Sequence, residues 1–264
     1  MSQQTVDAPP ARPSRRSVAA GMAWAVPVIA VGAAAPRAAA SPCNPQAYTL
    51  DWGGSNTSYT RNNAGTSGVA TIDPDGAGPV ASVSMSIASQ FIGTMKAGNE
   101  FGNTNNNIRV SSSSVGGTGQ VGLSFHQALT NAYNVVPGRS ARQEVTFSFD
   151  APVTGLTFMV TDIDSNAGDF NDRIEFSGAF TSQIANTNTL TGAGTQPNPF
   201  APTNANAPVN DTSSTAGNVR ITYPGTITSF TMTYWNAVSS YSGVDRSQGV
   251  FLSDFAFSVI RNNC

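Results

Sequence analysis

Apolar and polar residues alternate one by one in several short stretches of this chain, and that spacing restricts those stretches to extended strands. In residues 227–235, read ITSFTMTYW, one side of the strand would carry Phe230, Met232 and Tyr234 while threonines occupy the other. Residues 251–260, read FLSDFAFSVI, repeat the pattern. Antiparallel sheets with one face on a core produce this alternation. The chain is therefore expected to be an antiparallel β-protein.

Strand signals of this kind recur along the chain between turn residues, while helical periodicity is almost absent. The predicted strands are 48–52, 69–72, 83–87, 121–125, 145–149, 156–161, 173–176, 219–223, 227–235 and 250–260. The stretch 126–133, read HQALTNAY, is compatible with one short helix or with a loop. So many short strands predict an all-β fold, an antiparallel two-sheet β-sandwich of jelly-roll type.

Residues 1–40 have the features of an export signal. Arg15 and Arg16 precede an uncharged apolar run, 17–35, and alanines at 38–40 supply the small residues that a signal peptidase needs. Pro27 within the run favours a cleaved signal over a membrane anchor that stays attached. The leader is expected to be removed after export by the Tat or Sec route, and no stable membrane insertion is expected after processing.

The mature chain, 41–264, is expected to form one β-sandwich domain outside the cytoplasm, either secreted or associated with the cell envelope. Loss of the leader shifts the net charge from −2 to −5, and Lys96 is the one lysine in the sequence. This acidity argues against nucleic acid as a partner. Two long polar loops are predicted near 99–119 and 187–218, where they either contact a ligand or serve as flexible decoration.

Two cysteines bracket the mature chain, Cys43 near its start and Cys264 at its end. In an oxidising compartment, such a pair most simply forms one disulfide that ties the two ends together. A lipidated Cys43 or two free thiols are the alternatives. The residues before Cys43, Ala-Ser-Pro, fit a lipidation signal badly, which favours the disulfide.

Five of the fifteen acidic residues lie within residues 161–178, read TDIDSNAGDFNDRIEFSG. The candidate metal ligands in this segment are Asp162, Asp164, Asn166, Asp169 and Asp172. Carboxylate and amide oxygens from one compact loop are the ligands that Ca²⁺ prefers. The segment is not an EF-hand, because Ala167 and Arg173 replace the glycine and glutamate which that loop requires. A polar hairpin without metal is the alternative, since aspartate and asparagine are common turn residues.

Catalysis is not expected from the sequence. The single histidine, His126, follows an apolar strand and has no Gly-x-Ser-x-Gly motif to accompany it, so no catalytic residue is assigned. Trp235 and Tyr241 flank a polar loop and are candidates for stacking on sugar rings, as is Trp52. Core or rim packing is the alternative for the two tryptophans, because large aromatic side chains are usually buried.

Two parts of the sequence resemble known secreted proteins. The leader RRSVAAGMAWAVPVIAVGAAAPRAAAS is similar to leaders of secreted and surface proteins of actinobacteria. The segments FSFDAPVTGLTFMVTDIDSNAGDFNDRIEFSG, NVRITYPGTITSFTMTYWN and GVFLSDFAFSV, within 144–260, resemble a recurring module of such proteins whose function is uncharacterised. The resemblance implies a β-sandwich on or outside the cell envelope but no activity. No sorting motif follows Ile260, which argues against covalent anchoring.

The sequence thus predicts a non-catalytic extracellular protein for interaction or envelope structure, stabilised by Ca²⁺ and needing no other cofactor. Its expected partner is an extracellular protein or a glycan. A carbohydrate-binding module is the alternative, and a secreted hydrolase is the third possibility.

Overall fold

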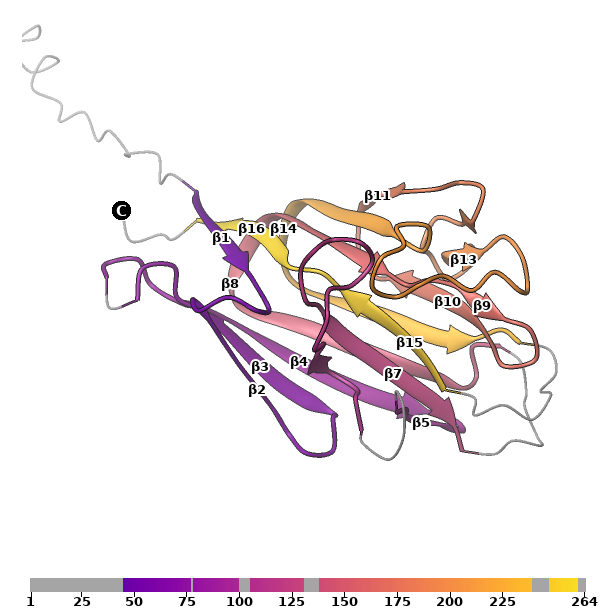
Figure 1. Ribbon diagram of the computed structural model, residues 1–264. Coiled ribbons are helices and arrows are strands. Elements are labelled where there is room, and N and C mark those ends of the chain that lie inside the picture. The colour runs from indigo at the N-terminus through magenta and orange to yellow at the C-terminus, as the bar shows by residue number, and fades with distance from the viewer. Residues whose placement is uncertain (1–44, 77, 100–104, 131–137, 239–246, 261–264) are drawn as a thin grey trace, which may run out of the picture. The chain divides into compact units, whose positions relative to one another are not determined.

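The protein is described by a computed structural model in residues 45–76, 78–99, 105–130, 138–238 and 247–260, all of which lie in strands, turns or irregular loops (Figure 1). The strands pair antiparallel throughout, so the predicted all-β, antiparallel fold class is confirmed. Residues 126–129 of the ambiguous HQALTNAY stretch belong to a strand and not to a helix. No helix long and apolar enough to cross a membrane occurs within these described ranges.

One continuous path of paired strands forms the larger part of the main sheet. Its order is β2 (Thr57–Arg61), β3 (Ser67–Ile72), β4 (Val83–Ile92), β8 (Arg142–Thr161), β14 (Val219–Asn236), β10 (Phe170–Phe176) and β9 (Ser165–Asn166). Three further strands pair directly with this path: β11 (Thr181–Ile184) with β14, and β15 (Ser247–Leu252) and β16 (Phe255–Val259) with β8. β1 (Gln46–Leu50) pairs with β16, β7 (Leu123–Leu129) pairs with β15, and β5 (Met95–Ala97) and β6 (Arg109–Val110) pair with β7. A separate small sheet pairs β12 (Leu190–Thr191) with β13 (Ala201–Pro202).

The two long strands β8 and β14 connect the parts of the main sheet. The first half of β8, residues 142–149, pairs with β4, whereas its second half, 153–161, pairs with β15 and β16. The register of β14 against β8 shifts twice, between Tyr223 and Thr226 and between Ile227 and Ser229. Such irregularities bend a strand. The pairing is consistent with a sandwich. The jelly-roll type is not confirmed, because the long strands β8 and β14 each run through both halves of the main sheet.

The core lies where these strands converge. Phe147 stacks on Phe230 with ring centroids 4.6 Å apart, and Phe158 stacks on Phe255 at the same distance. The four rings come from both halves of β8, from β14 and from β16, and none is more than 2% exposed. Trp52 is also buried and donates from Nε1 to the carbonyl of Ser253 over 3.0 Å, so it packs in the core.

Strands β7 and β15 provide residues that line both candidate binding sites, which are described below. They pair so that Gly249 is opposite His126 and Phe251 is opposite Ser124. Val250 and its neighbour Leu252 belong to the hydrophobic core, so the residues that alternate with them face the other side of the sheet. The polar loops that follow β6 and precede β14 line a cleft together with Ser124 and Phe251 of this side, and backbone hydrogen bonds join the two loops.

We expect Phe230→Ala to lower the free energy of unfolding by about 3–5 kcal/mol, because it removes a ring that contacts both halves of the sheet. Urea unfolding followed by fluorescence measures the change. Val69→Ala is the matched control, since Val69 is 45% exposed and its truncation should change stability by less than about 0.5 kcal/mol. Equal effects of the two substitutions would contradict the assigned core.

Candidate functional site

The acidic segment is a hairpin that begins at the end of β8. Asp162 follows Thr161 and has a left-handed backbone conformation with φ of 70°, which aspartate adopts more readily than most residues. Farther along, Asn166 pairs with Phe170, and the amide of Asp169 donates to the carbonyl of Asn166 over 3.0 Å. These contacts define the positions of the candidate metal ligands, but they do not bring all five to one place.

Asp172 lies inside the protein, beneath the hairpin. It is fully buried, and its carboxylate accepts hydrogen bonds from the Tyr234 hydroxyl over 2.9 Å and from the Asp164 amide over 3.1 Å. Burial raises the pKa of Asp172 well above its usual range, and the nearby Asp164 carboxylate raises it further. Alternation within β10 accounts for the position, since Asp172 shares a face with the buried Ile174 and Phe176. Asp172 therefore supports the hairpin from below.

The other four candidate ligands line one cleft of about 410 Å³, which we call the acidic cleft. Its acidic and amide lining residues from the loops are Asn99, Asp162, Asp164, Asn166, Asp169 and Asp211. Its floor includes His126, Gly249 and Phe251 from β7 and β15. Neither lysine nor arginine is among the described residues that line it, so four carboxyl groups border the space without a lysine or arginine to neutralise them.

Asp211 reaches the acidic cleft from the loop before β14, and the sequence analysis missed it. The amide of Val209 donates to Asp164 Oδ2 over 2.8 Å, which fixes this loop beside the hairpin. On its other side, the Asp211 carbonyl accepts a hydrogen bond from the Gly116 amide over 2.6 Å. These contacts join segments far apart in the chain, so no local pattern could have identified Asp211.

The electrostatics of the acidic cleft favour the protonated form of one carboxyl group. Burial raises the pKa of Asp164 to about 7; the Val209 hydrogen bond opposes this rise and the charge of Asp211 adds to it. Burial also lowers the pKa of His126 to about 4, so its ring is neutral at pH 7. That ring packs edge-on against Phe251 with centroids 5.8 Å apart, and a side chain at Gly249 would overlap it.

A second cleft of about 650 Å³ adjoins the first, because Asp211 and Phe251 line both. Most of its lining is hydroxyl- or amide-bearing: Asn106, Ser111, Ser112, Ser113, Ser114, Ser124, Asn210 and Thr212. Arg109 provides its positive charge. We call it the hydroxyl cleft. It includes part of the predicted loop 99–119 and part of the predicted loop 187–218.

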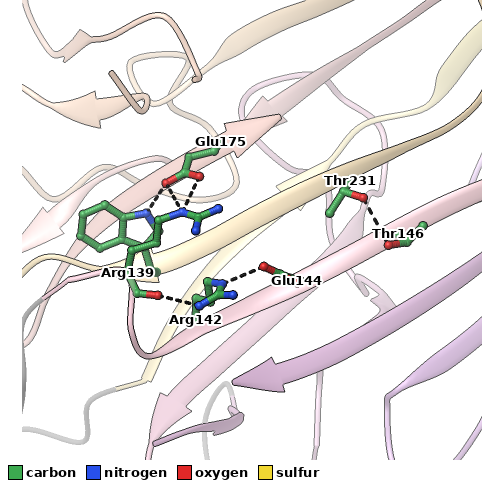
Figure 2. A network of polar contacts seen from close by, with 7 residues as sticks. Arg139, Arg142, Glu144, Thr146, Glu175 and Thr231 are labelled. Carbon is green, nitrogen blue, oxygen red and sulfur yellow. Dashed lines mark hydrogen bonds and ion pairs between the residues drawn. The ribbon is translucent and has the colours of Figure 1, made fainter. Parts of the chain in front are cut away.

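Trp235 lies elsewhere, half-buried on β14, beside the ion pair of Arg139 with Glu175 that Figure 2 shows. Its indole N–H donates to Glu175 Oε1 over 2.8 Å, and Arg139 Nε donates to both oxygens of the same carboxylate over 3.0 and 2.8 Å. The guanidinium carbon of Arg173 lies 5.9 Å from the centroid of the Trp235 ring. The polar edge of Trp235 is thus satisfied within the protein, and Trp235 lines neither cleft.

Arg173 contacts neighbouring polar groups, and within the described residues it forms no ion pair with a carboxylate of the acidic hairpin. Its Nη1 donates to the side chain of Asn171 and, over 2.6 Å, to the backbone carbonyl of Asp172.

Three residues with predicted roles, Tyr241, Cys43 and Cys264, lie outside the described residues.

No protein-family model matches the chain, and no curated protein matches its sequence significantly. Within the described ranges, no group of three His, Cys, Asp or Glu side chains converges closely enough to hold a metal ion by itself. The two clefts are therefore the features of the described structure that bear on function.

In EDTA, we expect the free energy of unfolding to fall by about 1 kcal/mol or more when the pH rises from 6.5 to 8. The folded state loses a proton over this range, whereas the unfolded state has already lost it near pH 4. Asp164, with its pKa raised to about 7, causes the loss, and Asp172 acts in the same direction. His126 acts oppositely, because its unfolded form is half protonated at pH 6.5 and loses that proton by pH 8, which offsets about 0.4 kcal/mol of the fall. Urea unfolding at both pH values measures the change.

Asp164→Asn should reduce this pH dependence, because it keeps the shape of the side chain and cannot ionise, while the contribution of the buried Asp172 remains. Asp150→Asn, on the exposed side of β8, is the matched control and should leave the dependence unchanged. A wild-type protein that becomes more stable as the pH rises from 6.5 to 8 would refute the assignment.

Proposed function

We propose that this chain is a non-catalytic extracellular binding protein whose acidic cleft holds Ca²⁺. One observation carries the proposal: four aspartates border a single cleft that no lysine or arginine of the described residues lines. Carboxylates brought together in this way repel one another, and a divalent cation relieves the repulsion. The raised pKa of Asp164 has the same origin in part, since the charge of Asp211 contributes to it.

The proposed ligands are Asp162, Asp164, Asp169 and Asp211, with the amide oxygen of Asn166. Ca²⁺ accepts six to eight oxygen ligands, which include backbone carbonyls and water, so it does not require a preformed cluster of three carboxylates. Binding would draw the hairpin and the loop before β14 toward each other. The cation would thereby stiffen the loops that border both clefts.

The extracellular location is supported by the leader pattern in residues 1–40 and by the resemblance to secreted actinobacterial proteins. The partner would be an extracellular protein or a glycan. The non-catalytic role is supported by the surroundings of His126, whose neutral ring packs against Phe251 and over Gly249. This environment suits packing better than proton transfer.

A secreted hydrolase is the second candidate, because a carboxyl group with a raised pKa beside another carboxylate is the arrangement that many glycosidases use. Asp164 and Asp211 have these properties. However, Asp164 is only 5% exposed and accepts the Val209 hydrogen bond, so it is better placed to organise the loops than to reach a substrate.

We expect millimolar Ca²⁺ to raise the melting temperature of the EDTA-treated protein by several degrees, because a ligand that binds only the folded state stabilises it. At a concentration about 100 times the dissociation constant, the stabilisation is about 2.7 kcal/mol. The double variant Asp162→Asn, Asp164→Asn should lose the shift, whereas Asp150→Asn should retain it. Differential scanning fluorimetry measures all three proteins.

The shift should also weaken below pH 7, since protonation of Asp164 competes with the cation. Absence of a shift at millimolar Ca²⁺ and pH 8, or an equal shift in the double variant, would refute the proposed metal site.

A further inference from the structure

The hydroxyl cleft has the chemistry of a binding site, and the proposed calcium site leaves it unused. It lies between the segment 109–115 and the loop 210–212, with Ser124 of β7 and Phe251 of β15 at its base. Its volume of about 650 Å³ is within the range of small-molecule sites and would hold roughly two or three sugar rings.

The charged groups of the hydroxyl cleft are available to a ligand. Arg109 is exposed, and within the described part of the chain neither its guanidinium nor the Asp211 carboxylate forms an ion pair or a side-chain hydrogen bond. The side-chain hydroxyls of Ser112 and Ser114 likewise make no hydrogen bond to the described residues. The cleft therefore offers the five N–H donors of a guanidinium group, the acceptor oxygens of a carboxylate, and hydroxyls that both donate and accept hydrogen bonds.

This set of groups matches a neutral ligand that carries many hydroxyls. One positive and one negative side chain balance each other, while hydroxyl and amide groups provide most of the remaining polar lining. An anionic ligand is disfavoured because the carboxylates of the acidic cleft adjoin the site through Asp211. Val110 and Phe251 add apolar surface, which suits the C–H face of a sugar ring.

The walls of the hydroxyl cleft are held in place by the backbone. Gly116 and Gly117 donate to the carbonyls of Asp211 and Thr212 over 2.6 and 3.0 Å, which joins the two loops. Gly116 has a φ of 55°, and a side chain there would overlap Thr161, so only glycine permits this approach. A preorganised cleft loses less entropy when a ligand binds.

We infer that the hydroxyl cleft binds a neutral oligosaccharide, with Arg109 and Asp211 as the main hydrogen-bonding residues. The inference names a ligand class for the binding function proposed above, and it does not require the metal. It also places the sugar-binding site away from Trp235, a residue that the sequence predicts for stacking on sugar rings.

Isothermal titration calorimetry and affinity electrophoresis of the purified protein test the inference. The probes are neutral gluco-, xylo- and manno-oligosaccharides of three to six rings, with oligogalacturonate as the anionic comparison, each in EDTA and in Ca²⁺. We expect at least one neutral probe to bind and oligogalacturonate to bind more weakly. Arg109→Gln should weaken binding about tenfold or more, because it removes charged hydrogen-bond donors.

Arg220→Gln is the matched control, since Arg220 is exposed on β14 and lines neither cleft. Trp235→Phe tests the earlier candidate site. Both controls should bind like the wild type, and melting temperatures confirm that each variant is folded. A second variant, Thr212→Val, should also weaken binding because Thr212 lines the cleft.

The inference is overturned if no neutral probe binds under either condition, if the anionic probe binds best, or if Trp235→Phe abolishes binding while Arg109→Gln does not. The proposed calcium site fails separately if a sugar binds in EDTA but Ca²⁺ does not raise the melting temperature. If the protein cleaves a bound oligosaccharide, the inferred binding site is still supported, but the proposed non-catalytic role is refuted.

Discussion

The pairing of β8 with β14 is the interaction on which the remaining structure depends. It joins residues 142–160 to 219–235 and crosses two irregularities in register, so that both strands serve both halves of the main sheet. The register places Phe147 opposite Phe230, where the two rings stack. A slip by one residue would turn the apolar side chains of a strand toward solvent, so burial of these rings specifies the alignment.

The same pairing brings the two sides of the acidic cleft together. Val160, near the end of β8, lies opposite Val219, the first residue of β14. The hairpin that follows β8 and the loop that precedes β14 therefore leave the sheet at the same end of these two strands, and the amide of Ile163 donates to the carbonyl of Gly217 over 3.0 Å. Two loops that are separate in sequence thus bring their aspartates to one place.

Asp211 connects the two proposed sites. Its carbonyl joins the loop that carries it to the glycine pair after Ser114, while its carboxyl group borders both clefts. A cation in the acidic cleft would reduce the negative charge beside the hydroxyl cleft and stiffen the shared wall. The two binding events would then be coupled through one residue, although each has an independent experimental test.

The sequence by itself determined the all-β class, most of the strands and the acidic hairpin, because alternation with a period of two is a local property that each strand displays. The same alternation, continued back from Phe176 and Ile174, would have placed Asp172 inside. Only the tertiary structure decided that Asp211 completes the acidic cleft and that Arg109 faces a wall of hydroxyls. Asp211 lies far along the chain from both Asp164 and Arg109, and strand order brings these residues together, which no local pattern records.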